Sequence, residues 1–204
     1  YKGKNLSKKK LAHIACKIEV EKCNKPIGMQ DQFSTAFGGF NKIEFKKSGI
    51  IVKKLKIPKK KLKYFRDNIM LFYTGVNRRA DKILLKIKNN KNQFKHFYKL
   101  VNLVDSFEKE LVDGNITNIG KILDENWSLK KDLSTKVSNL KINEIYDVAI
   151  DSGALGGKLL GAGGGGYFLF LVPQRKQKKV RKSLQKLEQI DFDFDTNGSQ
   201  SFVV

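Results

Sequence analysis

The sequence contains no long hydrophobic run. No stretch of its 204 residues approaches about 18 consecutive apolar residues, and its first residues lack the apolar core of a signal peptide. These absences argue against a membrane partner and against secretion, so we expect a cytoplasmic protein. The chain begins with Tyr1 rather than Met, and we expect it to be part of a longer protein.

Cysteine is scarce as well. The two cysteines, Cys16 and Cys23, lie seven residues apart within a helical pattern, and the sequence has no third cysteine to complete a metal site. We interpret both as buried free thiols, which are consistent with a reducing compartment.

Acidic residues are half as frequent as basic ones. The chain has 41 Lys and Arg against 20 Asp and Glu, which gives a net charge of +21. Nucleic acid is a common partner of such basic proteins. The basic residues are nevertheless spread over almost the whole chain, and we find no aromatic-basic RNA motif, zinc-finger spacing or helix-turn-helix pattern. We therefore interpret most lysines as solvated and expect no specific nucleic-acid partner.

Apolar spacing predicts a succession of helices and strands in an α+β protein. In the first part we expect a helix over 7–24, with Ser7 as its N-cap, and a short helix near 30–37. A hairpin of strands 42–47 and 50–57 should follow. After it we expect a helix that begins at Pro58 and a buried strand at 69–74. In the second part we expect helices over 78–149, with breaks near 89–90, 113–114 and 129–132. A buried strand at 167–172 and a basic helix over 173–188 should follow. Short strands are expected at 190–194 and 201–204. This order favours an antiparallel sheet covered by helices on one face.

Asp31 lies at the expected start of the short helix. A carboxylate at this position is stabilised by the helix dipole, and it could assist a hydroxyl group that must lose a proton. Glu19 and Glu21 on the preceding helix could add a second carboxylate, and Mg²⁺ prefers such oxygen ligands. From the residues alone, an N-cap role for Asp31 is equally compatible with its position.

Eight of the 17 glycines lie between Gly153 and Gly166. This segment is not a Walker A loop, because no Ser or Thr follows Lys158, and it is not a Rossmann fingerprint, because it leads into a strand. Glycines permit positive φ and let the backbone approach a ligand or another loop. A tight turn without a ligand is the alternative interpretation.

Three segments together resemble the GHMP kinase superfamily, which includes galactokinase, homoserine kinase and mevalonate kinase. The resemblance is greatest to bacterial heptose 7-phosphate kinases, and it follows the whole chain in order. It is carried by Gly28-Met29-Gln30-Asp31-Gln32-Phe33-Ser34-Thr35-Ala36-Phe37-Gly38-Gly39-Phe40-Asn41, by Leu71-Phe72-Tyr73-Thr74-Gly75-Val76-Asn77-Arg78 and by Gly153 through Gly166.

The resemblance implies an ATP-dependent sugar kinase that uses Mg²⁺. It places Asp31 beside the accepting hydroxyl as the catalytic residue and Glu19 at the metal, with Glu21 as the alternative. The glycine-rich segment corresponds to a turn that packs beside the nucleotide phosphate loop. The implied residues of that turn are Gly161, Ala162, Gly163, Gly164 and Gly165.

The resemblance also implies a binding site for the sugar phosphate. Its candidates are Gln30, Thr74, Gly75, Arg78 and Lys158. Arg78 is the candidate for the phosphate of the sugar itself, because a guanidinium fork suits phosphate oxygens, with Arg79 as its competitor. The alternative for Lys158 is an ordinary solvated lysine.

Two departures from the family pattern affect these expectations. Met29 stands where close heptose kinases usually have Lys, so one positive charge beside Asp31 is absent. No Gly-Leu-Gly-Ser-Ser-Ser type loop, which in the family wraps the ATP phosphates, occurs in the 204 residues. We therefore expect the chain alone to have negligible activity, while the longer protein transfers the γ-phosphoryl of ATP to a sugar hydroxyl, at the anomeric position.

In domain terms, we expect residues 1–45 to be the tail of a ribosomal-S5-like N-terminal lobe. Residues 46–204 are then a ferredoxin-like C-terminal domain. A non-catalytic remnant or a basic nucleic-acid-binding module is the alternative function.

Overall fold

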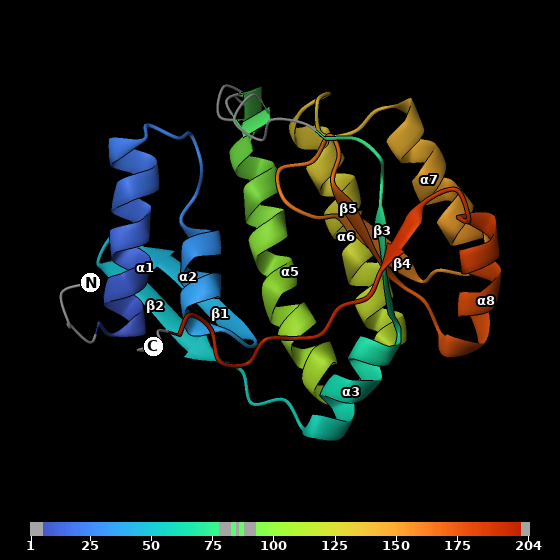
Figure 1. The fold of residues 1–204 in the computed structure, drawn as a ribbon, viewed down its shortest axis with the longest axis horizontal. Coiled ribbons are helices and arrows are strands. Elements are labelled where there is room, and N and C mark those ends of the chain that lie inside the picture. Colours follow the sequence, from blue (N-terminus) through green and yellow to red (C-terminus); the bar gives the residue numbers. More distant parts are fainter. Residues whose placement is uncertain (1–5, 78–82, 85, 88–92, 201–204) are drawn as a thin grey trace, which may run out of the picture. The chain divides into compact units, whose positions relative to one another are not determined.

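The computed structural model describes residues 6–77, 83–84, 86–87 and 93–200 (Figure 1). The chain divides into two compact units. Unit 1 comprises residues 1–56 and 193–204, and unit 2 comprises residues 57–192. These units are defined by contacts within the chain, so the expected division at residue 45 stays a prediction. Among the described residues, no helix is both long enough and apolar enough to cross a membrane.

The first helix of unit 1 begins as the sequence predicts. Helix α1, Lys8–Cys16, is capped by the Ser7 side chain, which accepts a hydrogen bond from the backbone N–H of Lys10. A π-helical turn, η1, continues it over Lys17–Lys22. Cys16 is buried and free, but Cys23 is exposed, so the prediction of two buried thiols was wrong for Cys23. Cys23 lies just after the last helical turn, where the helix no longer packs against the core.

Helix α2 and a hairpin complete the core of unit 1. Helix α2 spans Gln30–Phe37, strand β1 spans Asn41–Lys46 and strand β2 spans Gly49–Lys54, with Lys46 opposite Gly49 in the antiparallel register. Phe33 is fully buried, and its ring contacts that of His13 on α1 edge-on at 5.2 Å. The predicted short helix and hairpin are therefore confirmed.

The C-terminal segment belongs to unit 1 and packs against the end of α2. The N–H of Gly39 donates to the carbonyl of Asp195 (2.7 Å), and the N–H of Ser199 donates to the carbonyl of Thr35 (3.0 Å). A Cβ on Gly38 would lie only 2.1 Å from the backbone nitrogen of Gly198, so this approach requires glycine. Both ends of the chain thus build unit 1.

Unit 2 contains a four-stranded antiparallel sheet in the order β4-β5-β3-β6. Its elements are α3 Lys59–Asp67, β3 Ile69–Tyr73, α5 Gln93–Asp113, α6 Ile116–Leu133, α7 Leu140–Asp151, β4 Gly156–Leu159, β5 Tyr167–Leu171, α8 Gln174–Ser183 and β6 Glu188–Ile190. The sequence of strand, helices, two strands, helix and strand is the β-α-β-β-α-β order of ferredoxin-like folds. The expected α+β architecture is confirmed.

Three details of unit 2 differ from the expectation. Strand β4 was not predicted, because glycine is depleted in strands and its first two residues are Gly156 and Gly157. The helix break expected near 129–132 lies instead after Leu133, because Leu129 and Leu133 are buried in continuous helix. The strand expected at 190–194 is β6, which ends at Ile190, and the strand expected at 201–204 lies outside the described residues.

One face of the sheet forms the core of unit 2. Met70 and Phe72 on β3 pair with Phe170 and Phe168 on β5, and all four side chains are buried. They pack in one cluster with residues of α6, α7 and α8, including Trp127, whose ring meets that of Phe168 edge-on at 5.7 Å. On the opposite face Leu71, Tyr73, Tyr167 and Leu169 are partly buried or exposed, whereas Ile69 and Leu171 at one end of the strands are buried.

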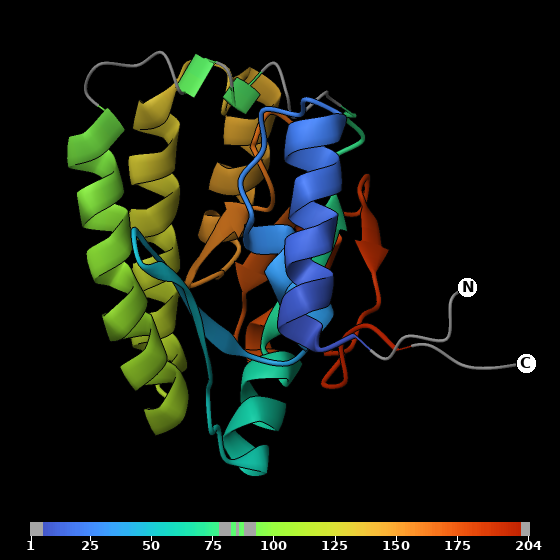
Figure 2. The ribbon, with the colours of Figure 1, turned by 90° about the vertical axis from the view of Figure 1, so that its left-hand side faces the viewer.

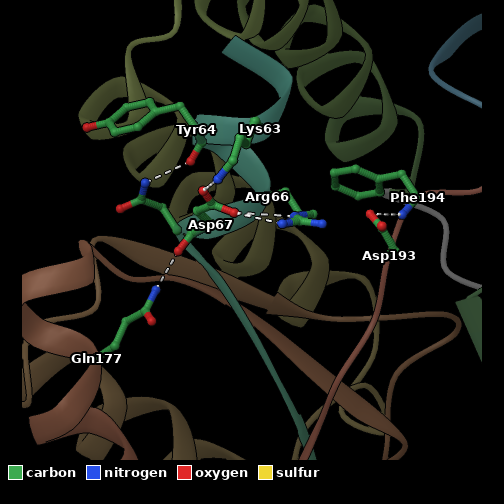
Figure 3. A network of polar contacts seen from close by, with 8 residues as sticks. Lys63, Tyr64, Arg66, Asp67, Gln177, Asp193 and Phe194 are labelled. Atoms are coloured by element: carbon green, nitrogen blue, oxygen red, sulfur yellow. Dashed lines mark hydrogen bonds and ion pairs between the residues drawn. The ribbon is translucent and has the colours of Figure 1, made fainter. Parts of the chain in front are cut away.

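A polar network fixes the start of β3 (Figure 3). The side chain of Gln177 on α8 donates to the carbonyl of Asp67 at 2.7 Å, and the buried side chain of Asn68 donates to the carbonyl of Tyr64 at 2.7 Å. Hydrogen bonds from Lys63, and then from Arg66, lower the pKa of the Asp67 carboxyl. The network anchors the strand whose other end leads to Thr74.

Helix α6 lies along strand β4 and beside α5 (Figure 2). A Cβ on Gly156 would lie 2.0 Å from the carbonyl oxygen of Gly120, and a Cβ on Gly120 would lie 2.5 Å from the Cβ of Leu155. Because both glycines lack a side chain, the helix and the strand approach at backbone contact distance.

Candidate functional site

The carboxylates singled out in the sequence share a groove in unit 1. The groove has a volume of about 270 Å³, and both Glu19 and Asp31 line it. Its remaining walls come from α1, α2 and the C-terminal segment: Leu11, Ala12, Ala15, Gln32, Thr35, Ala36 and Ser199. Ser199 was missed in the sequence because it is far from the other lining residues along the chain. Glu21 is not among the lining residues.

Asp31 is the second residue of α2, not its cap. The N-cap is Met29, which makes no side-chain capping bond, so the alternative interpretation of Asp31 as an N-cap was wrong. Asp31 and Gln30 are both exposed in the first turn of the helix. The position leaves the carboxylate accessible and close to the positive end of the helix dipole.

Glu19 is held by a side chain that the sequence did not single out. The Gln32 side-chain amide donates to Glu19 Oε2 at 2.5 Å, and Gln32 Oε1 is a buried acceptor without a hydrogen-bond partner among the described residues. The Glu19 carboxylate is the oxygen group at this end of the groove that could contact a hard cation such as Mg²⁺. No cluster of three or more acidic, His or Cys side chains occurs in the described part of the chain.

The glycine-rich turn, residues 160–166, connects β4 to β5 in unit 2. The N–H of Gly164 donates to the carbonyl of Val137 (2.7 Å), and the N–H of Gly166 donates to the carbonyl of Val76 (2.9 Å). The hydroxyl of Thr74 donates to the carbonyl of Gly166 at 2.9 Å. The structure thus brings Thr74 to the turn, a contact that the sequence did not indicate, and its role with a substrate stays a prediction.

Two glycines of the turn lie against backbone where a side chain would not fit. A Cβ on Gly165 would lie 2.4 Å from the carbonyl oxygen of Val76, and one on Gly163 would lie 2.9 Å from that of Val137. Gly163 also has a φ of +101°. Packing against the loops that follow β3 and α6 therefore explains these two glycines without a ligand.

Thr74 and Gly75 begin the loop after β3. Thr74 is fully buried, and Gly75 has a φ of +68° with the Lys141 ammonium 3.6 Å from the position of a Cβ. Arg78 and its competitor Arg79 lie outside the described residues.

Lys158 lies on β4 and is partly buried rather than freely solvated. Burial lowers the pKa of its ammonium group. The sequence analysis missed a second partly buried lysine, Lys130 on α6, which donates to the carbonyls of Leu159 (3.1 Å) and Gly161. Burial, together with repulsion from Lys158, lowers the pKa of Lys130 to about 7.

Known proteins resemble this chain over nearly its whole length. It is 30% identical over 203 residues to the D-glycero-alpha-D-manno-heptose 7-phosphate kinase of Campylobacter jejuni, an alignment that covers 97% of this chain and 60% of that kinase. The chain therefore spans less than two thirds of this relative.

Solved structures share the fold. A D-glycero-D-manno-heptose 1-phosphate kinase from Bacteroides thetaiotaomicron superposes with a TM-score of 0.70 at 24% identity, over 98% of this chain and 57% of that one. The mevalonate kinase of Methanococcus jannaschii superposes with a TM-score of 0.70 at 24% identity, over 95% and 58%. At this identity the likeness establishes the fold alone.

The family model for the C-terminal part of GHMP kinases matches residues 107–188. This match covers α6, α7, the glycine-rich turn and α8, which are the elements that build and support the turn. Residues 107–188 are therefore similar to the C-terminal part of GHMP kinases.

Proposed function

We propose that this chain is part of a kinase that transfers the γ-phosphoryl group of ATP to a hydroxyl of a sugar phosphate. The observation that carries the proposal is the groove of unit 1, which presents Asp31 and Glu19 together. The acceptor is a heptose 7-phosphate or a similar sugar, phosphorylated at its anomeric hydroxyl, in line with the named activity of the Campylobacter jejuni relative.

In this proposal Asp31 accepts or electrostatically holds the proton of the attacking hydroxyl. Its exposed position in the first turn of α2 leaves the carboxylate accessible to a substrate. General-base assistance of this kind contributes about 10²–10⁴ in rate. Gln30, one residue earlier and also exposed, is the residue proposed to contact the sugar.

Glu19 is the residue proposed to hold Mg²⁺. It lines the groove with Asp31, whereas Glu21 does not, and this favours Glu19 of the two. Gln32 orients the Glu19 carboxylate through the hydrogen bond at 2.5 Å. A bound Mg²⁺ would neutralise charge on the phosphates of ATP.

The remaining proposed contacts belong to unit 2. Thr74, Gly75, Arg78 and Lys158 bind the acceptor, and the turn formed by Gly161, Ala162, Gly163, Gly164 and Gly165 lies beside the nucleotide phosphates. Burial of the Lys158 ammonium without a carboxylate partner among the described residues supports a role with an anionic ligand.

We further propose that the 204 residues alone turn over negligibly. Phosphoryl transfer depends mainly on positioning and on charge neutralisation, and the sequence contains no glycine-serine loop to wrap the ATP phosphates. A coupled assay with ATP, Mg²⁺ and heptose 7-phosphate tests both proposals. The 204-residue chain should be inactive, and the protein extended upstream by its own gene should be active; robust turnover by the shorter chain contradicts the second proposal, and inactivity of the longer one with this sugar contradicts the acceptor assignment.

A further inference from the structure

Lys130 joins the end of a strand to the start of the glycine-rich turn. Its ammonium group donates to the carbonyl of Leu159, the last residue of β4, at 3.1 Å. It also donates to the carbonyl of Gly161, which has a φ of +68° at the beginning of the turn. One cation therefore holds two carbonyls on either side of the point where the chain leaves the sheet.

The packing of α6 explains how Lys130 reaches this point. The backbone contact of Gly120 with Gly156 sets the helix against the first residue of β4. Ten residues further along α6, Lys130 meets the other end of the strand. Trp127, 1% exposed and packed against Phe168, fixes the intervening turn of the helix.

The position of Lys130 is unfavourable for a charged group. Burial is the larger cause of its lowered pKa, and repulsion from Lys158 is the smaller one. Within the described part of the chain, neither lysine forms an ion pair with a carboxylate. The two carbonyl groups are therefore the hydrogen-bond acceptors that stabilise the Lys130 ammonium group. An apolar side chain at this position would be expected to stabilise the fold at least as well. The two hydrogen bonds are therefore the contribution that only a donor such as lysine can make here.

We propose that Lys130 is the positioning residue of the glycine-rich turn. Its amine hydrogen bonds hold the turn in the conformation in which Gly164 bonds to Val137 and Gly166 bonds to Val76. Any consequence for phosphoryl transfer rests on the function proposed above, whereas the conformation of the turn can be measured without it.

Hydrogen exchange of three amides, followed by NMR on the 204-residue protein, tests the proposal. Leu160, Gly164 and Gly166 each donate a backbone hydrogen bond that depends on the turn. Lys130→Met keeps most of the side-chain length but cannot donate. Since hydrogen bonds to charged groups contribute about 1.5–3 kcal/mol, local opening should accelerate exchange of these amides about tenfold or more.

Three controls separate positioning from general stability. Lys131→Met changes the next residue of α6, whose ammonium lies 5.9 Å from the ring centroids of Trp127 and Tyr146, and should leave the three amides within about twofold. The Leu155 amide, bonded to Leu171 at 2.8 Å beyond the opposite end of β4, reports stability within each variant. Lys130→Arg, which can still donate, should restore most of the protection.

Unchanged exchange at the three amides in Lys130→Met, or equal acceleration at Leu155, overturns the proposal. If Lys130→Met does not fold, Lys130→Leu supplies the test, because this side chain also lacks a donor. Exchange at the three amides should then accelerate relative to exchange at Leu155, and equal behaviour of all four amides overturns the proposal. Absence of kinase activity in the longer protein would leave these outcomes unchanged, so failure of the proposed function is recognised separately.

Discussion

The segment around Asp31 and the glycine-rich turn differ in how far the fold accounts for their residues. In the turn, Gly163 and Gly165 lie against backbone, and their identity follows from packing. Around Asp31, the side chain is exposed, and a Cβ on Gly28 would meet nothing within 4 Å. The glycine-rich turn is therefore constrained by packing, whereas among the described residues no close packing contact of this kind accounts for Asp31.

The largest expected effect is a loss of activity without a loss of stability. Asp31→Asn in the upstream-extended protein should lower kcat by about 10²–10⁴, because the amide cannot accept the hydroxyl proton. The melting temperature should not change measurably, since the side chain is exposed. Near-normal kcat would remove Asp31 from the proposed mechanism, and unfolding would show that the fold depends on it.

Substitution in the glycine-rich turn should instead lower the stability of the fold. Gly165→Ala places a Cβ 2.4 Å from the carbonyl oxygen of Val76, so the loop after β3 must move. We expect the free energy of unfolding to fall by about 1–3 kcal/mol, as for other overpacked sites. Urea titration of the 204-residue chain measures this, and a loss below about 0.5 kcal/mol would show that the two loops are not tightly packed.

Two substitutions with smaller expected effects on stability compare a glycine of the turn with a glycine near Asp31. Gly161→Ala meets no neighbour within 4 Å but must adopt a φ of +68°, which costs about 1–2 kcal/mol. Gly28→Ala has the same open space without a positive φ and should be nearly neutral in the same titration. Equal effects of the two substitutions would contradict the backbone explanation for Gly161.

The smallest expected effect concerns the charge state of Lys130. Lysine ¹³Cε NMR should show Lys130 titrating with a pKa of about 7. Lys158→Met should raise that pKa, but only in part, because burial is the larger cause of its depression. No upward shift in Lys158→Met would contradict the repulsion between the two lysines.

The lowered pKa of Lys130 also predicts how the free energy of unfolding depends on pH. Between about pH 7 and the ordinary lysine pKa of about 10.4, the unfolded chain holds a proton that folded Lys130 has lost. Stability should therefore rise with pH across this window. Lys130→Met should remove that part of the rise, as urea titrations at several pH values can determine.

Local patterns predicted local structure well. The N-cap at Ser7, the helix that carries Asp31 and the buried strands β3 and β5 all follow from the residue types within a few positions. Strand β4 was missed because its pairing with β5, not the propensity of its glycines, makes it a strand.

The missed parts of the site depend on distant contacts. The contact between Ser199 and Thr35 spans 164 residues, and Lys130 meets Leu159 and Gly161 across 29 and 31 residues. In a chain with 41 basic residues, no local pattern distinguishes one lysine as buried. The oxygen atoms around Glu19 likewise come together only when η1 meets α2.

Because residues 57–192 are inserted between two parts of unit 1, synthesis imposes an order on folding. Residues 193–200 leave the ribosome after the whole of unit 2, yet they provide Ser199 to the wall of the Asp31 groove and Gly198 to the contact with Gly38. Unit 2 is complete before these residues emerge, so it can fold first during translation. The groove can therefore be completed only after unit 2 has emerged, and a chain exposed as far as residue 192 would have its glycine-rich turn in place while the wall formed by Ser199 is still missing.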